Sequence, residues 1–298
     1  MTAKACLRSM RLRTLPLSLS GIVLGVLLAA RDHDFSVLTV ILLALTTVCL
    51  QILSNLSNEL GDTLSGTDRA DRQGIHYSIQ DGEMTIPEMK RLIGCMAVLS
   101  CLFGFGMVWS AFGTVLEPLP LGFLALGAAA VWAAMHYTLG KHPYGYRGLG
   151  DVFVFVFFGL ATVCGGYFLT CLSWDWRILL PAAAIGCFSV GVLNVNNIRD
   201  MKSDAATRVT VALKMGERRA RIYQTVLIAA GWVLMTVFAL TYRPFSPWHL
   251  LYFVSVFRFV QHLKGVWTRK DRELDPMLPM LVQATALLSV LGGIGFLF

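Results

Sequence analysis

Two stretches of this sequence carry an amide and a carboxylate four residues apart. In the first, Asn58 is followed by Asp62; in the second, Asn196 is followed by Asp200, with Asp204 four residues further on. Side chains three or four residues apart lie on one face of a helix, so each stretch would present its oxygen atoms together. The recurrence indicates a weak internal duplication.

Oxygen atoms in this arrangement are typical of a magnesium site. Carboxylates are unfavourable at the C-terminus of a helix, and polar groups within apolar turns are costly unless something satisfies them. Mg²⁺ is commonly held by one or two carboxylates together with phosphate oxygens. We therefore predict two or three Mg²⁺ ions bridging a diphosphate; the alternative is that the acids only cap helices at a membrane surface. The predicted metal ligands are Asn58, Asp62, Asp68, Asn196, Asp200 and Asp204.

Basic side chains close to both stretches favour an anionic ligand. A guanidinium or ammonium group can contact phosphate oxygens directly. The candidates for this contact are Arg72, Lys141, Arg199, Lys202 and Arg208.

The elements that must position these side chains are membrane-spanning helices. The 298 residues are 56% hydrophobic and 14% charged, and their mean hydropathy is +0.64. Soluble domains carry about 25% charged residues, so an ordinary soluble enzyme is excluded. Uncharged runs of about 20 residues suit transmembrane helices rather than barrel strands. We predict one all-α domain over 1–298, with spans at about 14–30, 35–58, 92–116, 118–140, 152–174, 178–198, 222–242, 246–264 and 276–298.

Basic residues between the predicted spans indicate the orientation. The N-terminal segment and the loops after the even-numbered spans hold 21 Lys and Arg residues, whereas the other loops hold only three, Arg31, Arg177 and Arg243. Because basic loops stay in the cytoplasm, the N-terminus is expected inside and the C-terminus in the periplasm. Both acidic stretches then lie at the cytoplasmic face of a bacterial inner membrane. The basic residues sit between helices, a pattern that does not indicate nucleic-acid binding.

Four segments of the sequence resemble the UbiA superfamily of intramembrane prenyltransferases. Residues 11–16 resemble its N-terminal motif, 51–72 its first Asp-rich motif, 137–151 its Tyr-Thr-x-Gly…Gly-Leu-Gly-Asp loop, and 196–216 its second Asp-rich motif. The two Asp-rich motifs are shared across the superfamily. The middle loop resembles the branch that prenylates 1,4-dihydroxy-2-naphthoate. One departure from the family pattern is Glu59, which stands where an Asp is usual.

The resemblance implies a ring of nine helices around an apolar central cavity. It also implies Mg²⁺-dependent transfer of a polyprenyl group from polyprenyl diphosphate to 1,4-dihydroxy-2-naphthoate, with loss of diphosphate and CO₂, giving demethylmenaquinone. The implied catalytic residues are Asp62, Asp200, Asp204, Lys141 and Asp151. The implied substrate-binding residues are Arg11, Asn55, Arg72, Tyr137, Tyr144, Tyr146, Asn197, Arg199, Lys202 and Arg208.

Residues 141–151 of the middle loop and Arg11 are the expected acceptor site. Together they offer a cation for the carboxylate of the acceptor and aromatic surfaces for the rings of the acceptor. Alternatively, the tyrosines of the loop only anchor the chain at the membrane interface, and Asp151 only favours a helix N-terminus. Aromatic residues in 152–158 could shield an allylic cation or serve only as packing residues.

Other functions remain open at this point. The acceptor could be another aromatic compound, such as 4-hydroxybenzoate. A secondary transporter also carries repeats and intramembrane acids, but its site lies near the membrane midplane. An inverted repeat would also place the two acidic stretches on opposite sides of the membrane, whereas here both fall on one side. The residues therefore favour a prenyltransferase.

Overall fold

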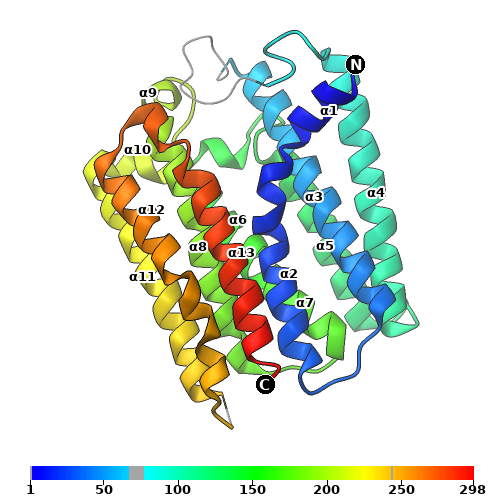
Figure 1. Ribbon diagram of the computed structural model, residues 1–298. Helices are drawn as coiled ribbons and strands as arrows, with labels where there is room; N and C mark the ends of the chain where they lie inside the picture. Colours follow the sequence, from blue (N-terminus) through cyan, green and yellow to red (C-terminus); the bar gives the residue numbers. More distant parts are fainter. Residues whose placement is uncertain (1, 67–76, 243) are drawn as a thin grey trace.

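The computed structural model describes residues 2–66, 77–242 and 244–298. Within these residues the chain is helical, and one isolated β-bridge joins Arg147 to Val209. Figure 1 shows an upright bundle in which the long helices run roughly alongside one another. The predicted all-α class is confirmed. Asp68 and Arg72 of the predicted site lie outside the described residues.

Eight segments of the described chain are long and apolar enough to cross a membrane. They are α1 (Ala3–Met10) with η1 (Leu12–Thr14) and α2 (Leu15–Ala30), α3 (Val37–Leu64), α4 (Ile86–Phe112), α5 (Pro118–His136), α6 (Gly150–Val154) with η3 (Phe155–Ala161) and α7 (Thr162–Cys171), η4 (Trp176–Ile178) with α8 (Leu179–Arg199), α11 (Glu217–Thr241), and η6 (Asp271–Leu274) with α13 (Met277–Gly295). Shorter helices connect them: η2 (Tyr144–Tyr146), α9 (Met201–Asp204) and α10 (Val211–Met215).

The predicted ninth span, 246–264, does not form a single long α-helix. Its chain begins as a 3₁₀-helix, η5 (Pro247–Ser255), and continues as α12 (Val256–Thr268). The 13 residues of α12 are fewer than the roughly 20 that a bilayer needs. Because a 3₁₀-helix rises more steeply, the two pieces together measure roughly 37 Å, and both pack along α13. Whether this rod crosses the membrane stays a prediction.

The two ends of the chain lie at opposite ends of the bundle. In Figure 1 the N-terminus is at the end that carries α9 and α10, and the C-terminus is at the other end. This placement agrees with an odd number of crossings. Which end faces the cytoplasm stays a prediction from the basic residues.

Glycines allow α2 to pack closely against α7. A Cβ atom added at Gly25 would overlap the backbone of Val163 and Tyr167, and one added at Gly21 would overlap the side chain of Thr162. Small residues at this spacing let transmembrane helices approach each other. Because α2 also contacts α3 and α13, it joins two parts of the bundle. One part is formed by α3, α4 and α5, and the other by α8, α11 and α13.

The two largest apolar cores stabilise these two parts. The larger one contains Phe188, Phe238 and Tyr252 and lies among α8, α11, η5 and α13. The smaller one contains Leu53 and Met89 and lies between α3 and α4. The space bounded by α2, α3, α5, η3 and α8 is not filled by side chains, and it forms the two cavities described next.

Candidate active site

A polar cavity and an apolar cavity adjoin inside the bundle. The polar cavity measures about 200 Å³ and the apolar cavity about 310 Å³. Gln51, Asn58, Tyr137 and Phe158 are among the residues that line both. A ligand with a charged head and an apolar tail could therefore occupy the two cavities at once.

The first acidic stretch lies on the last turns of α3, which extends beyond the predicted span to Leu64. Asn58 and Asp62 both line the polar cavity, as their four-residue spacing predicts. Gly61 between them leaves room for Thr138, whose hydroxyl donates to the Ser57 carbonyl at 2.9 Å and to Asn58 Oδ1 at 3.3 Å. The loop after α5 is thereby held against the first acidic stretch.

The second acidic stretch lies where α8 ends and α9 begins. The amide of Asp204 donates to the Asp200 carbonyl at 2.9 Å, so the helical turn continues past the end of α8. Asn196 and Asn197 line the polar cavity. Asp200 and Asp204 are almost fully buried and lie beneath the cavity wall, whereas Arg199 and Arg208 are part of that wall.

Arg208 brings the two acidic stretches together. Its Nε lies 3.0 Å from Asp204 Oδ1 and its Nη2 lies 3.7 Å from Asp62 Oδ2. Burial alone would lower the pKa of the Arg208 guanidinium, but the carboxylates of Asp62 and Asp204 raise that pKa above its usual range. Tyr146 completes this group, because its Oη donates to Asp62 Oδ1 at 2.7 Å and its ring lies 5.4 Å from the guanidinium. Two acids that are distant in the sequence thus share one cation.

Arg199 is bonded to two carboxylates at the same time. Its Nε and Nη2 donate to the two oxygens of Asp200 at 2.8 and 2.7 Å, and Nη2 also donates to Asn196 Oδ1 at 2.9 Å. Its Nη1 donates to Asp275 Oδ1 at 2.7 Å. Asp275, which lies just before α13 and lines the polar cavity, is not among the site residues predicted from the sequence. Its only sequence signal is that it is the last acid before the final apolar run.

The donor set around the polar cavity suits Mg²⁺ only together with an anionic ligand. Within residues 2–66, 77–242 and 244–298, no three acidic, His or Cys side chains form a ready metal centre. Instead, carboxylate and amide oxygens approach from α3 on one side and from α8 and α9 on the other. Mg²⁺ keeps several waters and often takes only one or two carboxylates beside phosphate oxygens. These residues therefore fit Mg²⁺ bound with a diphosphate.

Arg11 also faces the polar cavity. It ends α1 in the left-handed conformation, with φ of 49°, and its guanidinium carbon lies 3.7 Å from the centre of the Tyr77 ring. Its Nε and Nη2 are buried and make no hydrogen bond within the described part of the chain. A buried hydrogen-bond donor without a partner costs free energy, so we expect this guanidinium to bind an anion.

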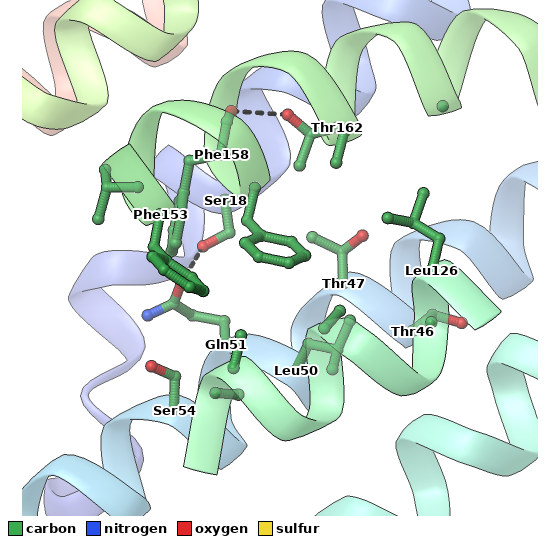
Figure 2. Close-up of a pocket in the computed structure, with 18 of the residues that line it drawn as sticks. Ser18, Thr46, Thr47, Leu50, Gln51, Ser54, Leu126, Phe153, Phe158 and Thr162 are labelled. Carbon is green, nitrogen blue, oxygen red and sulfur yellow. Dashed lines mark hydrogen bonds between the residues drawn. The ribbon is translucent and has the colours of Figure 1, made fainter. Parts of the chain in front are cut away.

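The apolar cavity is bounded by aromatic rings on one side and by α3 on the other. Figure 2 shows Phe153 and Phe158 on one wall and Thr47, Leu50 and Gln51 on the facing wall. Phe153 stacks on Tyr144 with ring centres 3.9 Å apart. Phe153 and Phe158, which belong to the aromatic run at 152–158, therefore line a cavity. The ring of Tyr144 lines it too, while its hydroxyl donates to the Ala133 carbonyl at 2.8 Å.

Several predicted site residues have other contacts. Asn55 lines the apolar cavity but ties α3 to the turn before α2, since its Nδ2 donates to the Met10 carbonyl at 2.9 Å and to Thr14 Oγ1 at 3.0 Å. Asp151 accepts a hydrogen bond from Tyr223 Oη at 3.0 Å. Glu59 does not line a cavity and accepts from the Ile79 amide at 3.0 Å. These contacts fix neighbouring elements around the site.

Two predicted site lysines are not brought to the cavities. Lys141 is exposed on the turn between Gly140 and Pro143 and lines neither cavity. Lys202 is 75% exposed and pairs with Asp271 at 2.9 Å. Lys141 lies in the turn that follows Gly140, whose φ is 98°, and Lys202 lies on the exposed side of α9. Sequence spacing alone does not predict these positions. The cationic side chains that line the polar cavity are Arg11, Arg13, Arg199 and Arg208.

Comparisons with known proteins agree with this arrangement. The model of the UbiA prenyltransferase family matches residues 18–284. The chain is 39% identical to the 1,4-dihydroxy-2-naphthoate octaprenyltransferase of Escherichia coli (strain K12), over 97% of this chain and 94% of that protein. It is 34% identical to the protein of the same name from Mycobacterium tuberculosis, over 96% of this chain and 95% of that one.

Solved structures show the same fold. The apo structure of a UbiA homolog from Aeropyrum pernix K1 matches with a TM-score of 0.70 at 17% identity, covering 96% of this chain and 97% of that one. A UbiA homolog from Archaeoglobus fulgidus bound to GPP and Mg²⁺ matches with a TM-score of 0.69 at 16% identity, covering 98% and 99%. At these identities the likeness concerns the fold alone.

Proposed function

The chain belongs to the UbiA prenyltransferase family, and from that premise we propose how it transfers a polyprenyl group to 1,4-dihydroxy-2-naphthoate in menaquinone biosynthesis. The observation that carries the proposal is the meeting of Asp62 and Asp204 at Arg208, in the wall of a polar cavity that adjoins an apolar one. The diphosphate head of the donor substrate binds in the polar cavity, and the first isoprene units bind in the apolar cavity.

The polar cavity holds the leaving group. Mg²⁺, when bound, neutralises the charge that develops on the departing diphosphate. Asn58, Asp62, Asn196, Asp200 and Asp204 would hold two or three such ions. Arg199 and Arg208 would contact the phosphate oxygens, because a guanidinium pairs with phosphate as readily as with carboxylate. Tyr146 keeps Asp62 oriented throughout.

The apolar cavity protects the electron-poor carbon. When the allylic C–O bond breaks, its electron pair leaves with the diphosphate and the allyl group becomes cationic. The ring faces of Phe153 and Phe158 stabilise such a cation and exclude water from it. Tyr137, which lines both cavities, lies where the two compartments meet.

The acceptor attacks through the ring carbon that bears its carboxylate. The new C–C bond uses a ring electron pair, and the C–CO₂ bond breaks so that its electrons return to the ring and CO₂ leaves. The product is the reduced form of demethylmenaquinone. Arg11 is placed to hold the acceptor carboxylate before attack, because two of its buried nitrogens have no other acceptor in the described residues.

The enzyme is a multi-pass membrane protein. We place it in the bacterial cytoplasmic membrane, with nine crossings that include the η5–α12 rod and with the polar cavity open to the cytoplasm. The 21-to-3 distribution of basic residues supports this orientation. The bilayer then supplies the apolar donor substrate, and the cytoplasm supplies the charged acceptor.

Product analysis by mass spectrometry tests the proposal. Purified protein with Mg²⁺ and a polyprenyl diphosphate is expected to prenylate 1,4-dihydroxy-2-naphthoate with release of CO₂ and to leave 4-hydroxybenzoate unchanged. Chelation by EDTA is expected to stop turnover. Prenylated 4-hydroxybenzoate as the main product would contradict the acceptor, and full turnover in EDTA would contradict the metal site.

A further inference from the structure

The Arg199 guanidinium occupies both oxygens of Asp200, one of the proposed metal ligands. Asp200 is fully buried, and both of its oxygens accept hydrogen bonds from the Arg199 guanidinium. Arg199, and not Asp200, lines the polar cavity. A divalent cation therefore reaches Asp200 only if Arg199 moves off it, because the ion and the guanidinium compete for the same two oxygens and repel each other.

Asp275 offers the guanidinium a second acceptor within reach. Its Oδ1 already accepts from Arg199 Nη1 at 2.7 Å, and its side chain is 36% exposed and lines the polar cavity. Its Oδ2 has no hydrogen bond among the contacts of the described residues. A carboxylate with one oxygen bonded to a guanidinium nitrogen can also use its second oxygen to accept from a second nitrogen. This bidentate pairing is the strongest geometry for an arginine and a carboxylate.

We propose that Asp275 is a positioning residue that takes Arg199 over from Asp200 when Asp200 binds Mg²⁺ with the diphosphate. The guanidinium stays charged and paired throughout, so the buried Asp200 is never left without a counter-ion and Arg199 is never left without a carboxylate. This inference rests on the proposed function, since it takes Asp200 as a metal ligand. The alternative is that the Arg199–Asp275 pair only fixes the start of α13 to the end of α8.

The two possibilities differ in their effect on Mg²⁺ binding. Without Asp275, Arg199 has only Asp200 left as an acidic partner, so the metal must compete with a more firmly held guanidinium. A pair that only joins two helices would lower stability and leave Mg²⁺ binding unchanged. The quantity to measure is therefore the Mg²⁺ concentration at half-maximal effect, and not the rate alone.

The chain contains a matched control. Asp271 lies four residues before Asp275 in the connection between α12 and α13, and it also pairs with a cation, Lys202, at 2.9 Å. That pair is exposed and does not line the polar cavity. Asp271→Asn removes the same charge as Asp275→Asn without touching Arg199.

The experiment follows thermal unfolding of the purified protein in detergent while Mg²⁺ is titrated at a fixed concentration of inorganic diphosphate, since a bound ligand raises the melting temperature. Asp275→Asn is expected to raise the half-maximal Mg²⁺ concentration roughly tenfold, as expected for losing a charge-assisted hydrogen bond. Asp271→Asn is expected to leave it within about twofold of the wild type, the usual error of additivity. Asp275→Glu is expected to restore most of the loss. Equal midpoints for Asp275→Asn and the wild type would overturn the proposal.

A double-mutant comparison tests whether Asp275 acts through Arg199. In an Arg199→Gln background, adding Asp275→Asn is expected to shift the Mg²⁺ midpoint by less than about twofold. A shift of about fivefold or more would mean that Asp275 acts on the metal directly, and would overturn the proposal. In the double variant both members of the Arg199–Asp275 pair are neutral, and the Asp200 carboxylate is freed of the guanidinium that bonds both of its oxygens in the wild type.

A third variant separates this inference from the proposed function. Asp200→Asn is expected to abolish the Mg²⁺-dependent rise in melting temperature. If Asp200→Asn behaves as the wild type, the metal role of Asp200 fails and this inference fails with it. If Asp200→Asn loses the response while Asp275→Asn keeps the wild-type midpoint, only the role of Asp275 is wrong.

Discussion

At the scale of single residues, the site is a set of acids held by cations that the same chain provides. Arg208 joins Asp62 to Asp204, and Arg199 joins Asp200 to Asp275. Two carboxylates this close would repel each other without a counter-ion. The arginines therefore let the chain fold with its acids gathered, and they remain at hand to pair with phosphate oxygens.

Tyr146 provides a test of this arrangement. Tyr146→Phe removes the hydroxyl that donates to Asp62 at 2.7 Å. A hydrogen bond to a charged group contributes about 1.5–3 kcal/mol, so turnover at a limiting concentration of prenyl diphosphate is expected to fall roughly 10- to 100-fold. Steady-state rates measured across a range of prenyl diphosphate concentrations check this.

The control for Tyr146 is its neighbour Tyr144, whose hydroxyl donates to the Ala133 carbonyl and contacts no acid in the described hydrogen bonds. Tyr144→Phe is expected to lower the melting temperature and to leave the apparent affinity for prenyl diphosphate near that of the wild type. A Tyr146→Phe enzyme as active as the wild type would mean that Asp62 does not depend on this hydrogen bond.

The spacing of the acids predicts the position of some site residues and not of others. Asn58 and Asp62 share a helix face and a cavity because a four-residue period is a local property of the chain. Asp275 could not be predicted, because its partner Arg199 is distant in the sequence and no local pattern connects them. Lys141 was expected at the site from its loop alone, and its exposure depends on how that loop turns.

At the scale of elements, helix ends determine where the chemistry is placed. α3 runs past the predicted end of its span to Leu64, so Asp62 lies on a rigid helix and not in a loop. η3 is a π-helical segment that lies beside α8 and bears Phe157 and Phe158 on the apolar cavity. Hydrophobicity predicted the spans that contain these segments, but it carries no information on a change of helical type within a span.

Packing of α2 against α7 yields a prediction for stability. Gly25→Ala adds a Cβ atom that overlaps the backbone of Val163, which cannot move away as a side chain could. Overpacking of this kind costs about 1–3 kcal/mol, so the melting temperature in detergent is expected to fall by several degrees. The same change at Gly122, where an added Cβ meets no atom within 4 Å, is the control.

Gly122→Ala is expected to leave the melting temperature unchanged or slightly raised, because alanine favours a helix over glycine by about 1 kcal/mol. If the two alanine variants melt at the same temperature, close contact between α2 and α7 does not limit the stability of the bundle.

At the scale of the whole molecule, the two acidic stretches can meet only if their helices end on the same side of the membrane. The predicted orientation satisfies this condition, and the termini at opposite ends of the bundle agree with it (Figure 1). A reporter in the 201–221 loop is expected to be cytoplasmic, and one after Phe298 is expected to be periplasmic. Reporter activity on the same side for both fusions would mean that the η5–α12 rod does not cross the bilayer.

The central claim is that acids from both stretches bind one Mg²⁺–diphosphate group. The most direct measurement is the binding of geranyl thiolodiphosphate, an unreactive analogue of the donor, to the wild type, Asp62→Asn and Asp200→Asn by calorimetry, with Mg²⁺ and with EDTA. Tight binding is expected only for the wild type with Mg²⁺. Each variant is expected to weaken binding at least about 100-fold, since even the outer partners of a metal contribute 10- to 100-fold. Equal affinity in EDTA, or wild-type affinity in either variant, would contradict a Mg²⁺–diphosphate site shared by the two acidic stretches.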